Sequence, residues 1–562
     1  DEEMARFLDE GPTQEEIDRV VTQIRAGLIR GLEQVGGFGG KAQLLARNAT
    51  YAGDASFYKV SMRRLTEATP EAVRDAARRW HSAGSLTIEV HPFDEATANE
   101  TGADRSNGPP MPDSFPDVDF DDFERAFLSN GMELIVASRN AVPVIQFSML
   151  LDAGYAADAF AKLGTSSLTM SMLDEGTKKL TSIEISDKLS KLGTNLGTGA
   201  NLDRSSVSLN TLKENLDPSL DIYADVIMNP QFPEKELSRL KKQTAAAIQR
   251  EQASPFGLAQ RLIPGLIYGE GHAYNMPLTG SGTEESLASI TRDDLVDFHA
   301  TWFRPNNATM IVVGDTTLSE IQPKLEKLFA KWKAQDVPQK NIGTVELNDA
   351  ERVYILDRPD AEQTLIIAAS IVPPTNNPDE VALQAMNGVL GGGFVGRVNM
   401  NLREDKAWAY GAGTAILGAT GPRPYIGYAP VQTDKTALSM AELRREMVEI
   451  RSTRPPEEDE LARVMDEKTL TLPGNWETAG SVLGSLAAMV RYGYDDDYWD
   501  TYADSVRGTT LSDVSEAAKK YVQPDSLVWV VVGDREKIEE EVRSLEYGEV
   551  TFLDVDGDPI AE

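Results

Sequence analysis

The sequence predicts an α+β fold of repeated domains, in which helices pack on antiparallel sheets. Three observations lead to this prediction. Helical patterns that each end in a short β-rich run recur with a period of about 220 residues. Asn130-Gly131 lies between two segments of alternating apolar and polar residues, which is typical of a β-hairpin. A chain of 562 residues is too long for one hydrophobic core, so roughly three or four domain-sized units are expected.

Two markers define the repeat. A helix with an N-terminal threonine, followed by a short strand, begins at Thr69, Thr291 and Thr510. A second helix lies upstream of each of these and begins near Thr13, Pro233 and Pro456. Because both markers share one period, we interpret them as an internal repeat. On this period the first unit would start about 120 residues before Asp1, so we expect it to be cut short.

The composition of the chain places the domain boundaries. We predict that residues 1–97 are the C-terminal part of a first domain and that residues 98–122, which are rich in Pro, Gly and Asp, are a linker. The second domain, 123–335, opens with the hairpin, continues with mainly helical patterns to about Ala247, and closes on a strand near Met310. The third domain, 336–562, follows the same order.

Charge and composition exclude several classes of function. A formal net charge of −34 is unsuited to sequence-independent nucleic-acid binding, whereas an acidic surface or chamber suits neutral or basic substrates. Without cysteine, the chain has no disulfides, thiolate nucleophiles or Cys-ligated metals. No apolar run of about 18 residues is present to span a membrane. The segment after Asp1 lacks the features of a signal peptide, so we expect that such a peptide was removed or that the true start lies elsewhere.

Landmark segments along the chain resemble those of peptidase family M16, the insulinase/pitrilysin-like zinc metallopeptidases. Besides the hairpin, these segments are LGTSSLTMSMLDEGT at 163–177, FPEKEL at 232–237, GHAYNMPLTG at 271–280 and LGGGFVGRVNMNLREDKAWAYG at 390–411. The resemblance covers essentially the whole chain. It implies LuxS/MPP-like domains in a clamshell of two halves around a peptide. This chain would then contain the end of a first half and a complete, inactive second half.

The zinc ligands of the family are missing from the segment that should carry them. Active members have His-x-x-Glu-His on a helix, where the two histidines bind zinc and the Glu acts on water, and a third ligand, Glu, about 80 residues later. Matched residue by residue, the histidines fall on Ser167 and Ser171, the catalytic Glu on Met170 and the third ligand on Ala247. None of these can replace an imidazole or a carboxylate, so we expect no metal site and no catalytic residue on this chain.

A second feature of the family is retained. Active members use an Arg, and a Tyr seven residues later, from the opposite half to hold substrate at the zinc site, and Arg403 and Tyr410 match this pair. An Arg offers several donors to peptide carbonyls, and a Tyr hydroxyl can donate to a developing oxyanion. The alternative interpretation is an ion-paired surface Arg and a core Tyr.

Other motifs have ordinary explanations. The four histidines contain no pair at i,i+4, and we expect surface or helix-packing roles for His81, His91, His272 and His299. The fingerprint G-x-G-x-x-G occurs at Gly391, Gly393 and Gly396, but without a strand before it and a helix after it in a βαβ unit, so we predict a glycine-rich turn. A hinge-like turn is also predicted at residues 36–40. Serine-hydrolase and nucleotide-hydrolase motifs are missing, and no spacing supports a glycosidase.

The resemblance therefore implies the non-catalytic portion of a zinc-dependent M16 endopeptidase, one that is inactive alone and encloses unfolded or extended peptides. Zn²⁺ and His-x-x-Glu-His would belong to a complementary half, upstream or on a partner chain. A non-enzymatic, M16-like structural or peptide-binding subunit is the alternative. Because bacterial two-half members are often exported, we expect a periplasmic or cell-envelope location, although a cytoplasmic one also fits a chain without cysteine.

Overall fold

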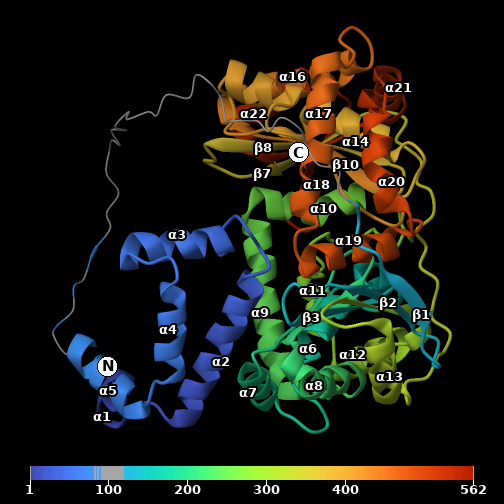
Figure 1. Cartoon of the computed structure of the whole chain (residues 1–562). Coiled ribbons are helices and arrows are strands. Elements are labelled where there is room, and N and C mark those ends of the chain that lie inside the picture. Colours follow the sequence, from blue (N-terminus) through green and yellow to red (C-terminus); the bar gives the residue numbers. More distant parts are fainter. Residues whose placement is uncertain (1, 82–83, 85, 87, 90–118, 561–562) are drawn as a thin grey trace. The chain divides into compact units, whose positions relative to one another are not determined.

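The computed structural model divides into two compact units (Figure 1). It describes residues 2–81, 84, 86, 88–89 and 119–560. The first unit is Asp1–Asp119 with Ser190–Gly193, and the second is Phe120–Leu189 with Thr194–Glu562. Residues 98–118 of the predicted linker lie outside the described residues.

The first unit is helical. Its described part contains α1 (Glu2–Glu10), α2 (Gln14–Gly31), α3 (Lys41–Ala52), α4 (Phe57–Thr66) and α5 (Pro70–His81). Thr13 begins α2 with a capping box, in which its hydroxyl accepts from the Glu16 amide at 3.2 Å and the Glu16 carboxylate accepts from the Thr13 amide at 2.7 Å. As predicted, residues 36–40 form a turn, which connects α2 to α3.

The β-rich run expected at 85–90 lies partly outside the described residues. Its described residues 86, 88 and 89 are not in a strand. In the later repeats, the matching strands pair with strands that precede them in the sequence. The described residues of the first unit contain no strand that could serve as such a partner.

The second unit begins with a six-stranded sheet in the order β1-β2-β6-β3-β5-β4. The strands are β1 (Glu124–Phe127), β2 (Glu133–Ser138), β3 (Val144–Leu151), β4 (Asn195–Ala200), β5 (Ser205–Leu212) and β6 (Ala308–Gly314). β1 and β2 form the predicted hairpin, and Gly131 in its loop has φ +91°. Neighbouring strands are antiparallel except β2 and β6. β4 and β5 lie where the sequence indicated mainly helices.

The helices of this domain follow the same chain order. They are α6 (Thr165–Met172), α7 (Ser182–Leu192), α8 (Leu216–Met228), α9 (Glu234–Ala253), α10 (Pro255–Ile267), α11 (Glu284–Ser289), α12 (Arg292–Trp302) and α13 (Leu318–Phe329). The predicted α+β class is therefore confirmed.

A seven-stranded sheet forms the second half of this unit, in the order β13-β12-β7-β11-β8-β10-β9. The strands are β7 (Arg352–Asp357), β8 (Gln363–Val372), β9 (Gly413–Ile416), β10 (Arg423–Gln432), β11 (Val528–Gly533), β12 (Glu549–Leu553) and β13 (Pro559–Ile560). The main helices are α14 (Glu380–Asn387), α16 (Thr436–Ile450), α17 (Glu458–Leu470), α18 (Leu472–Asn475), α19 (Ala479–Tyr492), α20 (Tyr498–Arg507), α21 (Leu511–Tyr521) and α22 (Arg535–Arg543). β7 pairs in parallel with β11 and β12.

The two sheet domains exchange one helix each. α10, from the first sheet domain, packs on β8 and β11 of the second sheet, and α19, from the second, packs on β3 and β6 of the first. Both helices lie between the two sheets in Figure 1. Apolar residues of α10, such as Leu258 and Ile263, join one hydrophobic cluster with Ile367 and Val530 of the second sheet. Each sheet is therefore covered on one face by the other domain.

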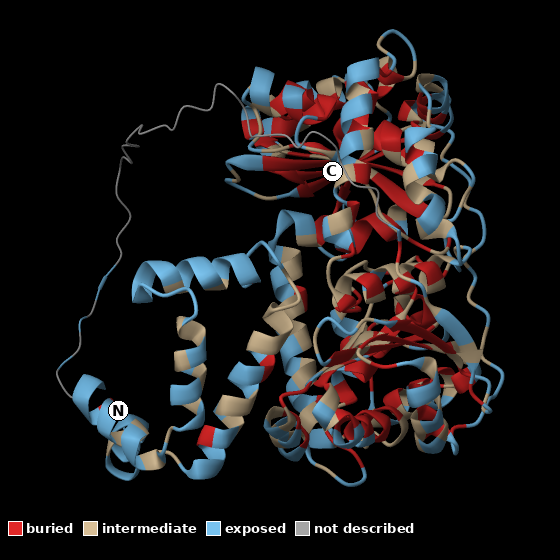
Figure 2. Ribbon diagram, in the orientation of Figure 1, coloured by how far each residue is buried: buried red, intermediate tan, exposed pale blue. Residues whose placement is uncertain are grey.

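The repeated threonine-capped helix carries an aromatic side chain that is buried in the second unit and exposed in the first. Trp302 of α12 is 1% exposed and Tyr521 of α21 is 8% exposed. Trp80 of α5 occupies the corresponding position and is 77% exposed. Figure 2 shows the same contrast, since buried residues gather on the sheets and adjoining helices, whereas α1–α5 are mostly exposed or intermediate. Helices α1 and α3 contain no buried residue.

This contrast predicts unequal effects of one substitution at two repeat positions. Trp302→Ala should lower the free energy of unfolding by about 3–5 kcal/mol, because it leaves a cavity in a packed core. Trp80→Ala should change it by less than about 0.5 kcal/mol, because the side chain is exposed. Urea unfolding followed by circular dichroism measures both. Similar losses for the two variants would contradict the difference in packing.

Candidate functional site

Helix α6 contains the positions at which zinc ligands are expected from the sequence, and a buried carboxylate fixes its start. Asp158 is 2% exposed and accepts hydrogen bonds from the amides of Gly164 at 2.7 Å and Ser166 at 2.8 Å. These are amides that a helix N-terminus leaves without an internal partner. Burial raises the pKa of Asp158 to about 7, and the two amide bonds act in the opposite direction.

The side chains of α6 at the three motif positions have no metal-binding arrangement. The Ser171 hydroxyl donates to the backbone oxygen of Ser167 at 2.9 Å, one helical turn earlier. Met170 is 1% exposed and belongs to the hydrophobic core. The position matched to the family's catalytic Glu is thus occupied by an apolar side chain that packs in the interior.

The remaining ligand position lies on a neighbouring helix. α9 packs against α6, and Ala247 on α9 is half-buried. Close to α6, Tyr155 donates from its hydroxyl to the backbone oxygen of Ala200 at 2.8 Å. Burial raises the pKa of Tyr155, so its phenol stays neutral. Gly280 allows the ring to fit, since a Cβ there would lie 2.2 Å from the ring carbon Cζ.

These residues do not fit a zinc ion. Hydroxyl, thioether and methyl groups stand where imidazole and carboxylate ligands would be required. Within residues 2–81 and 119–560, and the few described between them, no group of three or more His, Asp or Glu side chains could hold a metal. The side chains at the four matched positions therefore offer neither a zinc ligand nor a general base.

The described histidines have packing or surface roles. His299 donates from Nε2 to the backbone oxygen of Ile227 at 2.8 Å, and burial lowers its pKa to about 4, which keeps it neutral. His272 stacks on Tyr268 with ring centroids 4.8 Å apart, and His81 is exposed. His91 lies outside the described residues.

Arg403 and Tyr410 are close together in the other sheet domain. Arg403 belongs to the π-helical segment η5 (Met400–Asp405), and Tyr410 precedes β9. The guanidinium carbon of Arg403 lies 5.5 Å from the ring centroid of Tyr410 and 4.6 Å from that of Phe394. Both distances are within the range of a cation–π contact. Tyr410 is 88% exposed, so it is not a core tyrosine.

The glycine-rich segment differs from its prediction in one respect. Gly391 belongs to the π-helical segment η4 (Gly388–Gly392), which continues α14, and only Gly393 and Gly396 lie in the turn that follows. Close packing explains the helical glycine, because a Cβ on Gly391 would lie 2.7 Å from the Thr414 amide nitrogen. The segment follows a helix instead of a strand, so the setting of a dinucleotide fingerprint is missing.

Sequence reasoning overlooked two residues at these sites. Phe394 completes the aromatic contacts of Arg403, and a bulky aromatic residue within a glycine-rich run was a usable signal. Asp158 fixes α6, but nothing in the local sequence distinguishes it from the other 88 acidic residues.

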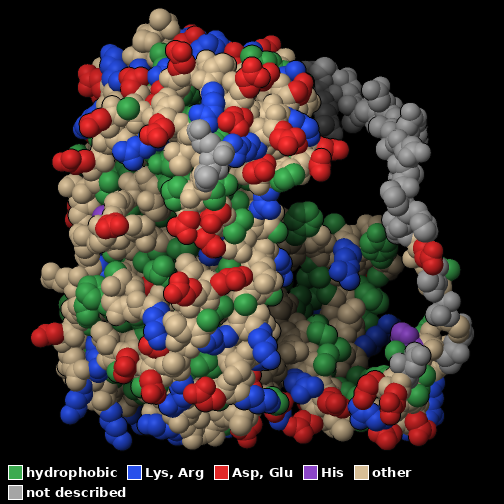
Figure 3. Space-filling model, turned by 180° about the vertical axis from the view of Figure 1, so that it is seen from behind, with side chains coloured by type: hydrophobic (Ala, Val, Ile, Leu, Met, Phe, Trp, Pro, Cys, Tyr) green, Lys and Arg blue, Asp and Glu red, His purple; other side chains and the backbone are tan. Residues whose placement is uncertain are grey.

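On the face shown in Figure 3, acidic and basic side chains are interspersed over the described surface.

Two family models match the chain. The model described as "Insulinase (Peptidase family M16)" matches residues 134–272, and the model described as "Peptidase M16 inactive domain" matches residues 289–467. The first match covers α6 and the positions matched to the zinc ligands, and the second covers Arg403 and Tyr410.

Individual proteins agree with these matches. A Rickettsia felis protein named "Uncharacterized zinc protease" is 23% identical over 348 residues, which cover 61% of this chain and 81% of that protein. The Helicobacter pylori "Non-peptidase homolog YmxG" is 22% identical over 385 residues, covering 67% of this chain and 86% of its own. The crystal structure of a peptidase M16 inactive domain from Pseudomonas fluorescens superposes with a TM-score of 0.69 at 24% identity, over 74% of this chain and 98% of that one.

The buried carboxylate of Asp158 predicts a pH-dependent stability. Its pKa is about 7 in the folded protein, against an ordinary value of 3.8 for an aspartate in the unfolded chain. Its stabilising contribution is therefore complete below about pH 4 and is lost as the pH rises through about 7. Asp158→Asn cannot ionise. As the pH rises from 5 to 8, the free energy of unfolding of the wild type, measured by urea titration, should fall by about 2–3 kcal/mol relative to that of the variant. A difference that does not change with pH would show that the helix amides keep the carboxylate ionised.

Proposed function

This chain belongs to peptidase family M16, and we propose that it supplies the non-catalytic portion of a zinc-dependent M16 endopeptidase. In this proposal it encloses unfolded or extended peptides and positions them for hydrolysis. Zinc and the catalytic Glu are supplied by a complementary M16 half that carries His-x-x-Glu-His, in the same polypeptide or on a partner chain. The isolated chain is then inactive.

One contrast supports the proposal: the positions matched to the zinc ligands hold side chains that cannot bind zinc, whereas an Arg and an exposed Tyr are present at the positions matched to the family's substrate-holding pair. The guanidinium carbon of Arg403 lies 5.5 Å from the ring centroid of Tyr410, and Tyr410 is exposed to solvent. An exposed Tyr stacked on an Arg buries little apolar surface and gives the fold little stability. Its geometry suits two donors that act together on the carbonyl of a bound peptide.

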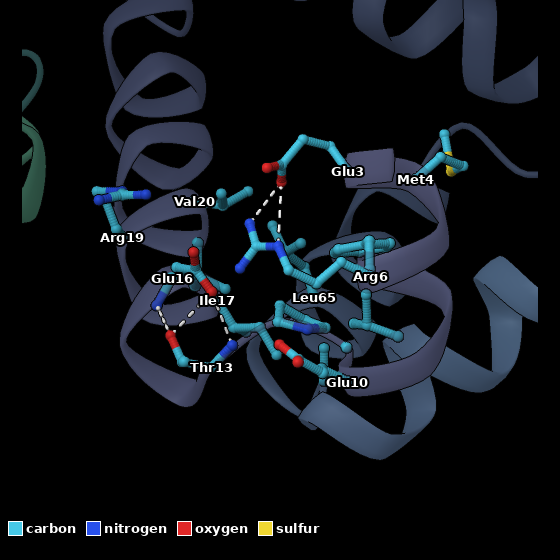
Figure 4. A pocket seen from close by; sticks show the side chains of 16 residues that line it. Glu3, Met4, Arg6, Glu10, Thr13, Glu16, Ile17, Arg19, Val20 and Leu65 are labelled. Atoms are coloured by element: carbon cyan, nitrogen blue, oxygen red, sulfur yellow. Dashed lines mark hydrogen bonds and ion pairs between the residues drawn. The ribbon is translucent and has the colours of Figure 1, made fainter. Parts of the chain in front are cut away.

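The first unit supports the presence of a complementary half. Three of its large side chains, those of Phe38, Tyr51 and Trp80, are 96%, 86% and 77% exposed. A cavity of about 650 Å³ lies among α1, α2, α4 and α5, with Met4, Val20 and Leu65 in its lining (Figure 4). Exposed apolar surface of this kind marks a contact with another protein layer. In the repeat that follows, the equivalent layer is a β-sheet.

The acidic character of the chain suits the proposed substrate and location. A net charge of −34 attracts basic peptides, repels acidic ones and leaves neutral ones unaffected. We place the enzyme in the periplasm or cell envelope, where a chain without cysteine avoids oxidative cross-linking.

A non-enzymatic subunit is the second candidate. One relative is named "Non-peptidase homolog YmxG", so the proteins similar to this chain include one that is named as a non-peptidase. A structural subunit would bind a partner through the first unit and would have no use for the exposed Arg403–Tyr410 pair. Activity of the assembled protein therefore separates the two candidates.

The first experiment compares this chain alone with the material isolated from its native source, including any co-purifying fragment. Elemental analysis should find zinc only in the native material. Cleavage of a quenched fluorescent peptide should likewise occur only there, and a chelator should abolish it. Zinc and cleavage missing from both samples would favour the structural subunit, and stoichiometric zinc in the isolated chain would mean that the ligand positions were misassigned.

The second experiment tests the Arg403–Tyr410 pair in the cleaving assembly. Arg403→Ala and Tyr410→Phe should each lower kcat/KM by about 10²-fold, which is the usual effect of removing one transition-state donor, while the zinc content stays constant. Arg507→Ala, at an exposed position on α20, is the matched control and should leave cleavage unchanged. Full activity in both site variants would remove these residues from the proposal.

A further inference from the structure

Two π-helical segments precede Tyr410, and one of them carries Arg403. They are η4 (Gly388–Gly392) and η5 (Met400–Asp405), and the other helical segments of the described residues are α- or 3₁₀-helical. π-helical turns are rare, and they occur frequently at functional sites. A π-helical turn is wider than an α-helical turn, so it shifts the direction of the side chains that follow. The direction of Arg403 therefore depends on what holds η5 in this conformation.

Hydrogen bonds of its own do not fix the side chain of Arg403. Its guanidinium contacts the rings of Phe394 and Tyr410, and it forms no hydrogen bond with any described residue. The carboxylate of Glu404 lies 3.5 Å from Nε of Arg403, and both side chains are partly exposed, so this ion pair is weak. The backbone of η5 thus determines where the guanidinium lies.

Asn401 anchors η5 to helix α16. It is 9% exposed, and its Nδ2 atom donates to Glu442 at 2.8 Å and to Glu446 at 2.7 Å, both on α16. Glu446 is 2% exposed and also accepts from Arg454 at 2.7 Å. Burial acts to raise the pKa of Glu442, but hydrogen bonds from Asn401 and Arg445 outweigh it and lower the pKa, so this carboxylate stays ionised. Two carboxylates therefore fix the orientation of one amide group.

Asn399 connects the segment of Arg403 with that of Tyr410. It is 4% exposed; its Nδ2 atom donates to the Phe394 backbone oxygen at 2.6 Å, and its Oδ1 atom accepts from the Ala412 amide at 3.1 Å. Asn399 immediately precedes η5, and Ala412 follows Tyr410 by two residues. The Asn399 side chain therefore sets the separation of the two segments.

We propose that Asn399 and Asn401 are positioning residues of the Arg403–Tyr410 pair. Asn401 holds the π-helical turn against α16, so that the guanidinium lies beside the Tyr410 ring, and Asn399 keeps the two segments at a fixed separation. Both amides are buried, so they act on a bound peptide only through the pair. This inference rests on the proposed function and adds to it the residues that hold its two donors in place.

Double-mutant cycles in the cleaving assembly test this inference. Asn401→Ala should lower kcat/KM about tenfold in the wild-type background, because it displaces Arg403. In the Arg403→Ala background the same change should alter kcat/KM less than about twofold, because the group that it positions is already missing. Asn399→Ala should show the same loss in the wild-type background and the same insensitivity in the Tyr410→Phe background. A substitution that only destabilised the fold would lower activity equally in both backgrounds.

Two further positions provide controls. Asn229→Ala removes an amide that donates to the buried carboxylate of Asp225 at 2.9 Å in the other sheet domain, and it should leave kcat/KM unchanged. Glu442→Gln keeps an oxygen that accepts from Asn401 and should retain more activity than Glu442→Leu, which cannot accept. The Glu442 variants also test the anchor if circular dichroism shows that Asn401→Ala does not fold.

The outcomes separate this inference from the proposed function. If the wild-type assembly does not cleave, or if Arg403→Ala and Tyr410→Phe are fully active, the proposed function fails and the positioning roles fail with it. If those two variants are impaired but the asparagine variants are fully active, or if the losses multiply, only the assignment of Asn399 and Asn401 is overturned.

Discussion

The buried carboxylate of Asp203 holds the second unit together. It is 2% exposed, and it accepts hydrogen bonds from the Tyr274 hydroxyl, from the Thr420 amide at 3.0 Å and from Arg491 at 3.3 Å. These donors come from both sheet domains and from α19. A buried carboxylate without such partners would cost several kcal/mol, so the two domains fit together in one arrangement that satisfies it. Burial and Coulombic repulsion from this carboxylate both raise the pKa of Tyr274, which keeps its hydroxyl a donor.

The exchange of helices depends on this arrangement. α10 and α19 each cover the sheet of the opposite domain, so neither sheet would be closed without the other. The first unit has a helix in the same chain position, α3, and it contains no buried residue. α5 is also largely exposed: Trp80 is exposed to solvent, whereas Trp302 and Tyr521 at the corresponding positions are buried. Helices with the same sequence pattern are therefore buried where a sheet packs against them and exposed where the described residues provide no sheet.

Periodic features of the fold were predictable from the sequence, and contacts between distant residues were not. The threonine caps at Thr291 and Thr510, and the hairpin at Gly131, depend on residues close in sequence, which is why local patterns identify them. β4 and β5 were missed because their short, polar segments become strands only by pairing with β3. At the candidate site, residue spacing located Arg403 and Tyr410. It did not predict that the Asn399 side chain bonds both the Phe394 backbone oxygen and the Ala412 amide.

Helix α6 and the Arg403–Tyr410 pair respond to different constraints. At position 170, burial favours Met over a carboxylate once no metal or water has to be activated, and Asp158 still holds the helix that the core requires. The packing of the fold therefore requires α6 whether or not it carries metal ligands. Phe394 and Tyr410 are 63% and 88% exposed, and the rings of both contact Arg403. Their exposed rings bury little apolar surface, so core packing does not account for aromatic side chains at these two positions.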